Sequence, residues 1–391
     1  MIQLAKDDLK SRSLAEPSDD ELTLRLSPRE WCVTIVVVLV LACSVSSFWK
    51  RVEPLNTTED FRVPFTWSDD YWTYQRHVDQ NADPIRFLVL GDSVVWGEYV
   101  TPDESLHAAL NRAMNGAMSR ATKNTGEQTE VVFANGGVNG LHPLAMQGLL
   151  RHYTSSISRQ RVILHCNLLW TSSVERDLQV DEEVSFNHPD LLPQFSPSIL
   201  SYRASAEHRL SISIQNRLPY RVLSRHFRVT NFEFQDVPSW SIEHPYESPW
   251  AQLRFESTAP RDEPHSPPIV WSEKIRRQLN MPWVDLKTSN QWAAFQDCVK
   301  LLQSRNNKVF VVVGPLNEHC LTPESGSRYR QNVDIVSDWL RDRKVSHFVP
   351  KTLSAEQYGD ASHPLASGYQ SLADEIATSD SFVEWMGRQS R

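Results

Sequence analysis

Short apolar runs alternate with amphipathic stretches in two parts of the chain, from residue 85 to 164 and from 291 to 378. Apolar runs without polar alternation are typical of strands buried on both faces of a sheet. They predict strands at residues 85–90, 131–134, 161–164, 308–313 and 346–349. The amphipathic stretches carry apolar residues at the spacing of one helix face. They predict helices at residues 105–122, 144–153, 291–305, 329–343 and 365–378. This alternation predicts an α/β fold, a three-layer α/β/α sandwich with a mainly parallel sheet.

Between about residues 174 and 286 the alternation stops, and the stretch is rich in Pro, His, Arg and Trp. We interpret this stretch as an insertion over one end of the sheet and not as an independent domain. The expected segments are a polar tail over 1–30, a membrane span over 31–49, a linker over 50–83 that packs onto the domain, the α/β domain over 84–380 and a C-terminal tail over 381–391.

One apolar stretch differs from the predicted strands and helices. From Trp31 to Trp49 the sequence has no charged residue, and charged residues flank the stretch on both sides. A helix of this length spans about 28 Å, close to the thickness of the hydrocarbon core of a bilayer. Tryptophan at both ends suits the membrane interface. The pattern predicts one membrane anchor; the alternatives are a buried core helix, a cleaved signal peptide and a lipoprotein signal.

The charges that flank this stretch do not decide its orientation. Arg25 and Arg29 precede it, whereas Lys50, Arg51 and Arg62 follow it. Large domains are translocated largely regardless of flanking charge. We therefore expect a single-pass signal-anchor with the α/β domain outside the cytoplasm.

Composition excludes several classes of function. The 391 residues include 40 Lys and Arg against 48 Asp and Glu, and this acidic balance without a long basic run argues against a nucleic-acid partner. The chain has five cysteines and no Cys-x-x-Cys pair, which argues against a disulfide scaffold and a zinc site. The histidines are too scattered to predict a metal site, and no pattern indicates an organic cofactor.

Polar residues follow the predicted strands at the points where the strands end. Ser93 follows the first strand, Gly140 the second and Asn167 the third, and Asp360 and His363 stand before the last helix. Because the carboxyl ends of parallel strands meet at one edge of a sheet, we expect these residues at a single site. Acyl transfer by a serine requires a nucleophile, a base, a carboxylate that orients the base, and donors for the oxyanion. This set supplies each of them.

The spacing suggests a role for each residue. Asp360 and His363 are three residues apart, so the carboxylate can hold the Nδ1–H of the imidazole and leave Nε2 facing Ser93. Pro364 suits the first position of the last helix, which would place His363 at the helix N-terminus, where the dipole favours the neutral ring. The structural alternatives are a helix N-cap for Ser93, a surface histidine for His363 and a strand-end residue for Asn167.

The ordered set resembles the SGNH (GDSL-type) hydrolases over roughly residues 84 to 380, interrupted by the insertion. The motifs that carry the resemblance are Gly91-Asp92-Ser93 with Gly97, the glycine Gly140, the asparagine Asn167, and the Asp-x-x-His block of Asp360 and His363. The resemblance implies a flavodoxin-like sheet and no cofactor. It implies Ser93 as nucleophile, His363 as base, Asp360 as the orienting carboxylate, and an oxyanion hole of Ser93, Gly140 and Asn167.

Two of the motif blocks depart from the pattern of that family. Val94 stands where the family most often has leucine, and the third block reads His165-Cys166-Asn167-Leu168 where the family usually has Gly-x-Asn-Asp. The function that the resemblance implies is a membrane-anchored serine esterase acting on ester-linked acyl groups of a small molecule or a glycan, such as O-acetyl groups. The alternatives are an O-acyltransferase with the same residues and an inactive SGNH-like scaffold or binding protein.

Overall fold

The computed structural model describes residues 26–83, 85–121, 131–216, 218–255, 263–274 and 277–387. Contacts divide the chain into two compact units, one ending at Trp49 and the other beginning at Lys50. The predicted linker and the insertion both belong to the second unit. Residues 1–25 of the predicted polar tail lie outside the described residues.

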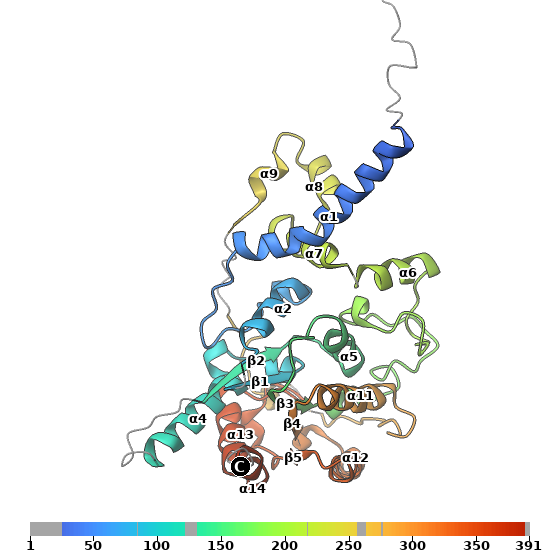
Figure 1. Ribbon diagram of the computed structural model, residues 1–391. Coiled ribbons are helices and arrows are strands. Elements are labelled where there is room, and N and C mark those ends of the chain that lie inside the picture. The colour runs from blue at the N-terminus through green and yellow to red at the C-terminus, as the bar shows by residue number, and fades with distance from the viewer. Residues whose placement is uncertain are drawn as a thin grey trace, which may run out of the picture. The chain divides into compact units, whose positions relative to one another are not determined.

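Helix α1 (Pro28–Val52) contains the predicted membrane span (Figure 1). Reciprocal hydrogen bonds cap its start: the N–H of Ser27 donates to Glu30 Oε2 at 2.7 Å, and the N–H of Glu30 donates to Ser27 Oγ at 3.3 Å. The helix is long and apolar enough to cross a membrane. Each apolar side chain from Ile35 to Leu41 is at least 50% exposed.

Within the described residues, the second unit has one sheet of five parallel strands in the order β2-β1-β3-β4-β5 (Figure 1). The strands are β1 (Arg86–Gly91), β2 (Val132–Gly137), β3 (Arg161–Cys166), β4 (Lys308–Val313) and β5 (Ser346–Phe348). All five predicted strands are confirmed. β2 and β3 extend past their apolar runs because the parallel ladder continues to Gly137 and Cys166. β1 and β3 are neighbours at the switch point, where doubly wound sheets place their sites.

Helices cover both faces of this sheet, as the alternation predicted. Leu88 and Leu90 of β1 pack into one core, and Phe87 and Val89 pack into the other, because successive side chains of a strand point to opposite faces. The helices of the first core are α2 (Tyr71–Gln80), α5 (Pro143–His152), α11 (Asn290–Ser304) and α12 (Pro323–Asp342). The helices of the second core are α4 (Leu106–Ala121), α13 (Ala366–Thr378) and α14 (Asp380–Gly387).

Two of these helices lie in segments for which the sequence predicted none. α2 lies in the predicted linker, and Tyr71 and Tyr74 bury their rings in the first core. α14 lies in the predicted C-terminal tail, and Phe382 and Trp385 bury theirs in the second. The sequence of α2 shows no clear apolar face because several of its buried side chains carry hydroxyl or imidazole groups. α14 is too short to repeat an apolar face. The predicted linker packs onto the domain as expected, but the helices α2 and α14 were not predicted.

The described part of the insertion contains five α-helices: α6 (Ala206–Gln215), α7 (Pro219–Asn231), α8 (Val237–Glu243), α9 (Pro249–Gln252) and α10 (Trp271–Lys274). A buried charged group joins α7 to the segment around α2. His226 Nδ1 lies 2.7 Å from Asp70 Oδ2, and its Nε2 lies 3.0 Å from Glu53 Oε2. Burial lowers the pKa of His226, but these two carboxylates outweigh burial and raise it to about 9. An ion pair therefore anchors the insertion.

Candidate active site

Ser93 is the first residue of the short helix α3 (Ser93–Trp96), which begins where β1 ends. Asp92 is the N-cap residue, and its carboxylate accepts a hydrogen bond from the N–H of Val94 at 3.0 Å. The chain turns so sharply that a Cβ at Gly91 would overlap the first turn of α3. This turn holds Ser93 at the carboxyl edge of the sheet. The cap role belongs to Asp92, so the alternative of Ser93 as an N-cap is wrong.

The structure brings Ser93, His363 and Asp360 together. Ser93 Oγ lies 2.7 Å from His363 Nε2, and His363 Nδ1 lies 2.7 Å from Asp360 Oδ2. Asp360 Oδ1 also accepts hydrogen bonds from the backbone N–H groups of Ser362 and His363, at 2.8 and 2.9 Å. Because a carboxylate accepts hydrogen bonds, the neutral imidazole carries its proton on Nδ1 and presents Nε2 as a base to the serine hydroxyl.

The charges around His363 favour its protonated form. Burial lowers the pKa of His363, but the charge and hydrogen bond of Asp360 outweigh burial and hold it above its ordinary value of 6.5. Burial raises the pKa of Asp360, and the facing imidazole and backbone N–H groups bring it below its ordinary range. Two predictions about this histidine are wrong. Helix α13, predicted as the last helix, begins at Ala366 and not at Pro364, and the adjacent carboxylate acts on the ring more strongly than the helix end.

Two residues that the sequence did not indicate support Asp360. The hydroxyl of Tyr99 donates to Asp360 Oδ2 at 3.2 Å, and its ring centroid lies 5.8 Å from that of His363. The amide of Asn317 donates to the backbone carbonyl of Asp360 at 3.1 Å. Tyr99 follows α3 and Asn317 follows β4, so both lie on loops at the carboxyl edge of the sheet. That position is the signal that would have pointed to them.

Asn167 directly follows β3, and its side-chain amide faces Asp92. Its Nδ2 donates to Asp92 Oδ2 at 2.8 Å, and its Oδ1 accepts from the N–H of Leu169 at 3.0 Å, which caps the 3₁₀ helix η4 (Leu168–Thr171). Asn167 therefore has the structural role of a strand-end residue, which was the alternative to a role as oxyanion donor. An amide nitrogen carries two N–H groups, so a second one remains for an oxyanion beside Ser93.

His165 and Trp170, from the end of β3 and from η4, contact Asp92. His165 Nδ1 lies 3.3 Å from Asp92 Oδ1, and Trp170 Nε1 donates to Asp92 Oδ2 at 2.8 Å. Burial raises the pKa of Asp92, but the adjacent imidazole of His165, with smaller contributions from His363 and Trp170, lowers it to about 2. Asp92 therefore remains a carboxylate and orients the amide of Asn167.

Gly140 lies in the turn that follows β2. Its φ is +69°, and a Cβ at this position would overlap the side-chain amide of Asn187, so both the conformation and the space require glycine. The N–H of Val138 donates to the carbonyl of Gly91 at 3.2 Å and so joins this turn to the end of β1. Among the described residues, neither the N–H of Gly140 nor that of Ser93 has a hydrogen-bond acceptor. Both N–H groups are therefore available to donate to an oxyanion.

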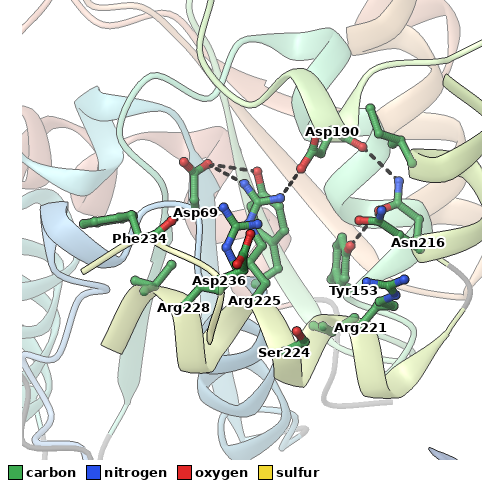
Figure 2. A pocket seen from close by; sticks show the side chains of 15 residues that line it. Asp69, Tyr153, Asp190, Asn216, Arg221, Ser224, Arg225, Arg228, Phe234 and Asp236 are labelled. Carbon is green, nitrogen blue, oxygen red and sulfur yellow. Dashed lines mark hydrogen bonds and ion pairs between the residues drawn. The ribbon is translucent and has the colours of Figure 1, made fainter. Parts of the chain in front are cut away.

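A cavity of about 410 Å³ lies beside α2, α6 and α7, and no residue of the Ser93–His363–Asp360 set lines it (Figure 2). Arginines and aspartates face each other in its wall. Arg225 lies 3.5 Å from Asp69 and also pairs with Asp190. In the part of the chain that the structure describes, no three His, Cys, Asp or Glu side chains are placed to hold a metal ion.

Two comparisons with known proteins gave no match. No protein-family model matches the chain, and no curated protein matches it. A functional assignment therefore depends on the arrangement of side chains at the carboxyl edge of the sheet.

Proposed function

We propose that the chain is a membrane-anchored serine hydrolase of the SGNH type that cleaves ester-linked acyl groups. The observation that carries the proposal is the hydrogen-bonded series from Ser93 Oγ through His363 to Asp360, with 2.7 Å at each step. The series lies at the switch point between β1 and β3, where parallel α/β sheets bind their ligands. The order of the motifs along the chain, which resembles the SGNH blocks, supports the same assignment.

In the proposed reaction, Ser93 Oγ attacks the carbonyl carbon of the ester while its proton passes to His363 Nε2. The carbonyl electron pair moves to the oxygen, and the N–H groups of Ser93, Gly140 and Asn167 stabilise this oxyanion. When the intermediate collapses, the ester C–O bond breaks and the departing alkoxide takes the proton from His363. Water then attacks the acyl-enzyme in the same way and releases the acid. Asp360 stays ionised and orients the imidazole throughout.

The proposed substrates are acyl esters, such as O-acetyl groups, on a small molecule or a glycan. In this proposal residues 31–49 of α1 span the membrane, and the unit that begins at Lys50 lies outside the cytoplasm. The length and apolar composition of α1 support the membrane part of the proposal.

The test of the nucleophile uses the full chain in detergent micelles, a fluorophosphonate probe and p-nitrophenyl acetate. We expect the probe to label the wild type, and we expect Ser93→Ala to lose both labelling and hydrolysis. Ser304→Ala is the matched control, because Ser304 is an exposed serine at the end of α11 and contacts no residue of the proposed site. It should be labelled and active like the wild type.

Labelling that survives Ser93→Ala would move the nucleophile elsewhere. A folded wild type that is neither labelled nor active would favour the scaffold alternative. Adding an alcohol to the hydrolysis assay separates hydrolase from transferase: a hydrolase releases acid, whereas an acyltransferase passes the acyl group to the alcohol.

A further inference from the structure

A segment of the insertion packs directly on the Gly140 turn. The side chain of Asn187 occupies the space that a Cβ of Gly140 would take. The next residue, His188, places its Nε2 2.8 Å from the backbone carbonyl of Asn139. The side chain of His188 is 2% exposed, so this contact is shielded from water. The insertion therefore touches the turn at the position of the proposed oxyanion donor.

The Asn139 carbonyl and the Gly140 N–H belong to the same peptide group. A peptide group is planar and trans, so its C=O and N–H point in opposite directions. A hydrogen bond that holds the Asn139 carbonyl toward His188 therefore also fixes the direction of the Gly140 N–H. A carbonyl can only accept, so His188 Nε2 is the donor. Hydrogen bonds in series polarise one another, and a donor on the carbonyl makes the N–H at the other end a stronger donor.

The opposite side of the His188 ring is also held. Its Nδ1 lies 3.1 Å from Asp69 Oδ1 and 3.0 Å from the hydroxyl oxygen of Tyr71. Burial raises the pKa of Asp69, but the adjacent His188 and the charge of Arg225 lower the pKa to about 2. Figure 2 shows Asp69 and Arg225 facing each other in the wall of the cavity. Because Nε2 carries the ring proton, Nδ1 accepts a hydrogen bond, and the hydroxyl of Tyr71 is its donor, while the Asp69 carboxylate lies beside this contact.

We propose that His188 is a positioning residue for catalysis: held at Nδ1 by the hydroxyl of Tyr71, it orients the Asn139–Gly140 peptide so that the N–H of Gly140 faces the oxyanion. This inference rests on the proposed function. In this proposal the insertion contributes to catalysis, because it supplies His188, which orients the N–H of Gly140 in the turn after β2. His188 does not contact the substrate and acts through the peptide group.

The test compares His188→Gln with His188→Met in the full chain. The Nε2 of glutamine is as many bonds from the backbone as the Nε2 of histidine, so Gln keeps a donor toward Asn139. Methionine has a similar length and no donor. Both replacements carry the same backbone strain, because the φ of residue 188 is +59°. The pair therefore differs in the hydrogen bond and in little else.

We expect His188→Met to lower kcat for p-nitrophenyl acetate by about 10- to 100-fold, less than the loss of a whole oxyanion donor, because the Gly140 N–H is misdirected and not removed. KM should stay within about twofold, since the interaction is made in the transition state. His188→Gln should recover kcat, measured per active site titrated with the fluorophosphonate probe, to within about threefold of the wild type. His188→Met should also have the lower thermal midpoint, because it leaves the buried Asn139 carbonyl without a donor.

A wild-type kcat in His188→Met, or an equal loss of kcat in both variants, would overturn the inference. If His188→Met does not fold, His188→Gly replaces it, because glycine adopts a positive φ without strain; a wild-type kcat in that variant would also overturn the inference. Fluorophosphonate labelling distinguishes a failure of the proposed function from a failure of the positioning role. Loss of labelling in the wild type defeats the proposed function, whereas labelled His188 variants with unchanged kcat defeat the positioning role alone.

Discussion

Replacing Asn167 by alanine tests stability and catalysis at one position. The side chain is 8% exposed and uses both ends of its amide, one on Asp92 and one on the N–H of Leu169. If its second N–H stabilises the oxyanion, the substitution removes a structural group and a catalytic group together. The two losses have different magnitudes and are measured separately.

The structural loss follows from the two hydrogen bonds. Loss of the cap on η4 costs about 1 kcal/mol of unfolding free energy. A hydrogen bond to a carboxylate contributes about 1.5–3 kcal/mol, but Asp92 keeps its donors from Val94 and Trp170, so the lower end applies. We expect Asn167→Ala to lower the free energy of unfolding by about 2–3 kcal/mol.

The catalytic loss is set by the oxyanion donor. Removing one such donor lowers kcat by about 10²–10³-fold, or roughly 2.7–4 kcal/mol, whereas loss of the nucleophile reaches the order of 10⁶-fold. Asn167→Ala should therefore retain measurable activity, and Ser93→Ala almost none. KM should change little, because the donor acts mainly in the transition state.

The assay measures kcat on p-nitrophenyl acetate per active site titrated with the fluorophosphonate probe, and the urea midpoint of the same samples. Ser205→Ala is the matched control, because Ser205 caps α6 with a hydrogen bond from the N–H of His208 at 3.1 Å and lies outside the proposed site. It should lose about 1 kcal/mol of stability and keep its kcat. A wild-type kcat per titrated site in Asn167→Ala would refute the donor role and leave Asn167 as a cap.

Two further predictions concern pH. Because His363 must be neutral to accept the serine proton and its pKa lies above 6.5, kcat/KM should rise with pH through an ionisation above 6.5. Asp360→Asn should move that ionisation to lower pH, and a profile unchanged by the substitution would contradict the assignment. The pKa of His226 is about 9 in the folded chain and near 6.5 in the unfolded chain. Its ion pair therefore contributes its full stabilisation of the folded state below pH 6.5, and this contribution is lost as the pH rises to 9. Urea unfolding should show a loss of about 3 kcal/mol over this range that His226→Gln abolishes; parallel pH curves for the two proteins would contradict it.

The strands and the main site residues were predictable because their signals are local. A strand covered on both faces must be apolar along its whole length, and the five runs have this property. In a parallel sheet the residues after each strand meet at one edge, which places Ser93 and Asn167 together from their sequence positions. The spacing of Asp360 and His363 lies within a single turn, so their pairing is also a local property.

The elements that were missed lack such a local signal. α2 buries aromatic residues with polar groups, and the partner of such a group can be distant in the sequence: the hydroxyl of Tyr74 donates to the carbonyl of Gly136 at 3.0 Å. Tyr99 likewise becomes part of the site through its contact with Asp360. Such residues look like ordinary loop or linker residues until the chain has folded.

The amino-acid sequence by itself determined the α/β class, the apolar stretch of α1, and which chemical groups gather at the carboxyl edge of the sheet. Tertiary structure alone decided which atoms face each other. The contact between Ser93 Oγ and His363 Nε2 joins residues 270 positions apart, and the contact between His188 and the Asn139 carbonyl joins the insertion to the sheet. The reason is physical: periodicity reports burial along one element, whereas hydrogen-bond partners depend on how separate elements pack in three dimensions.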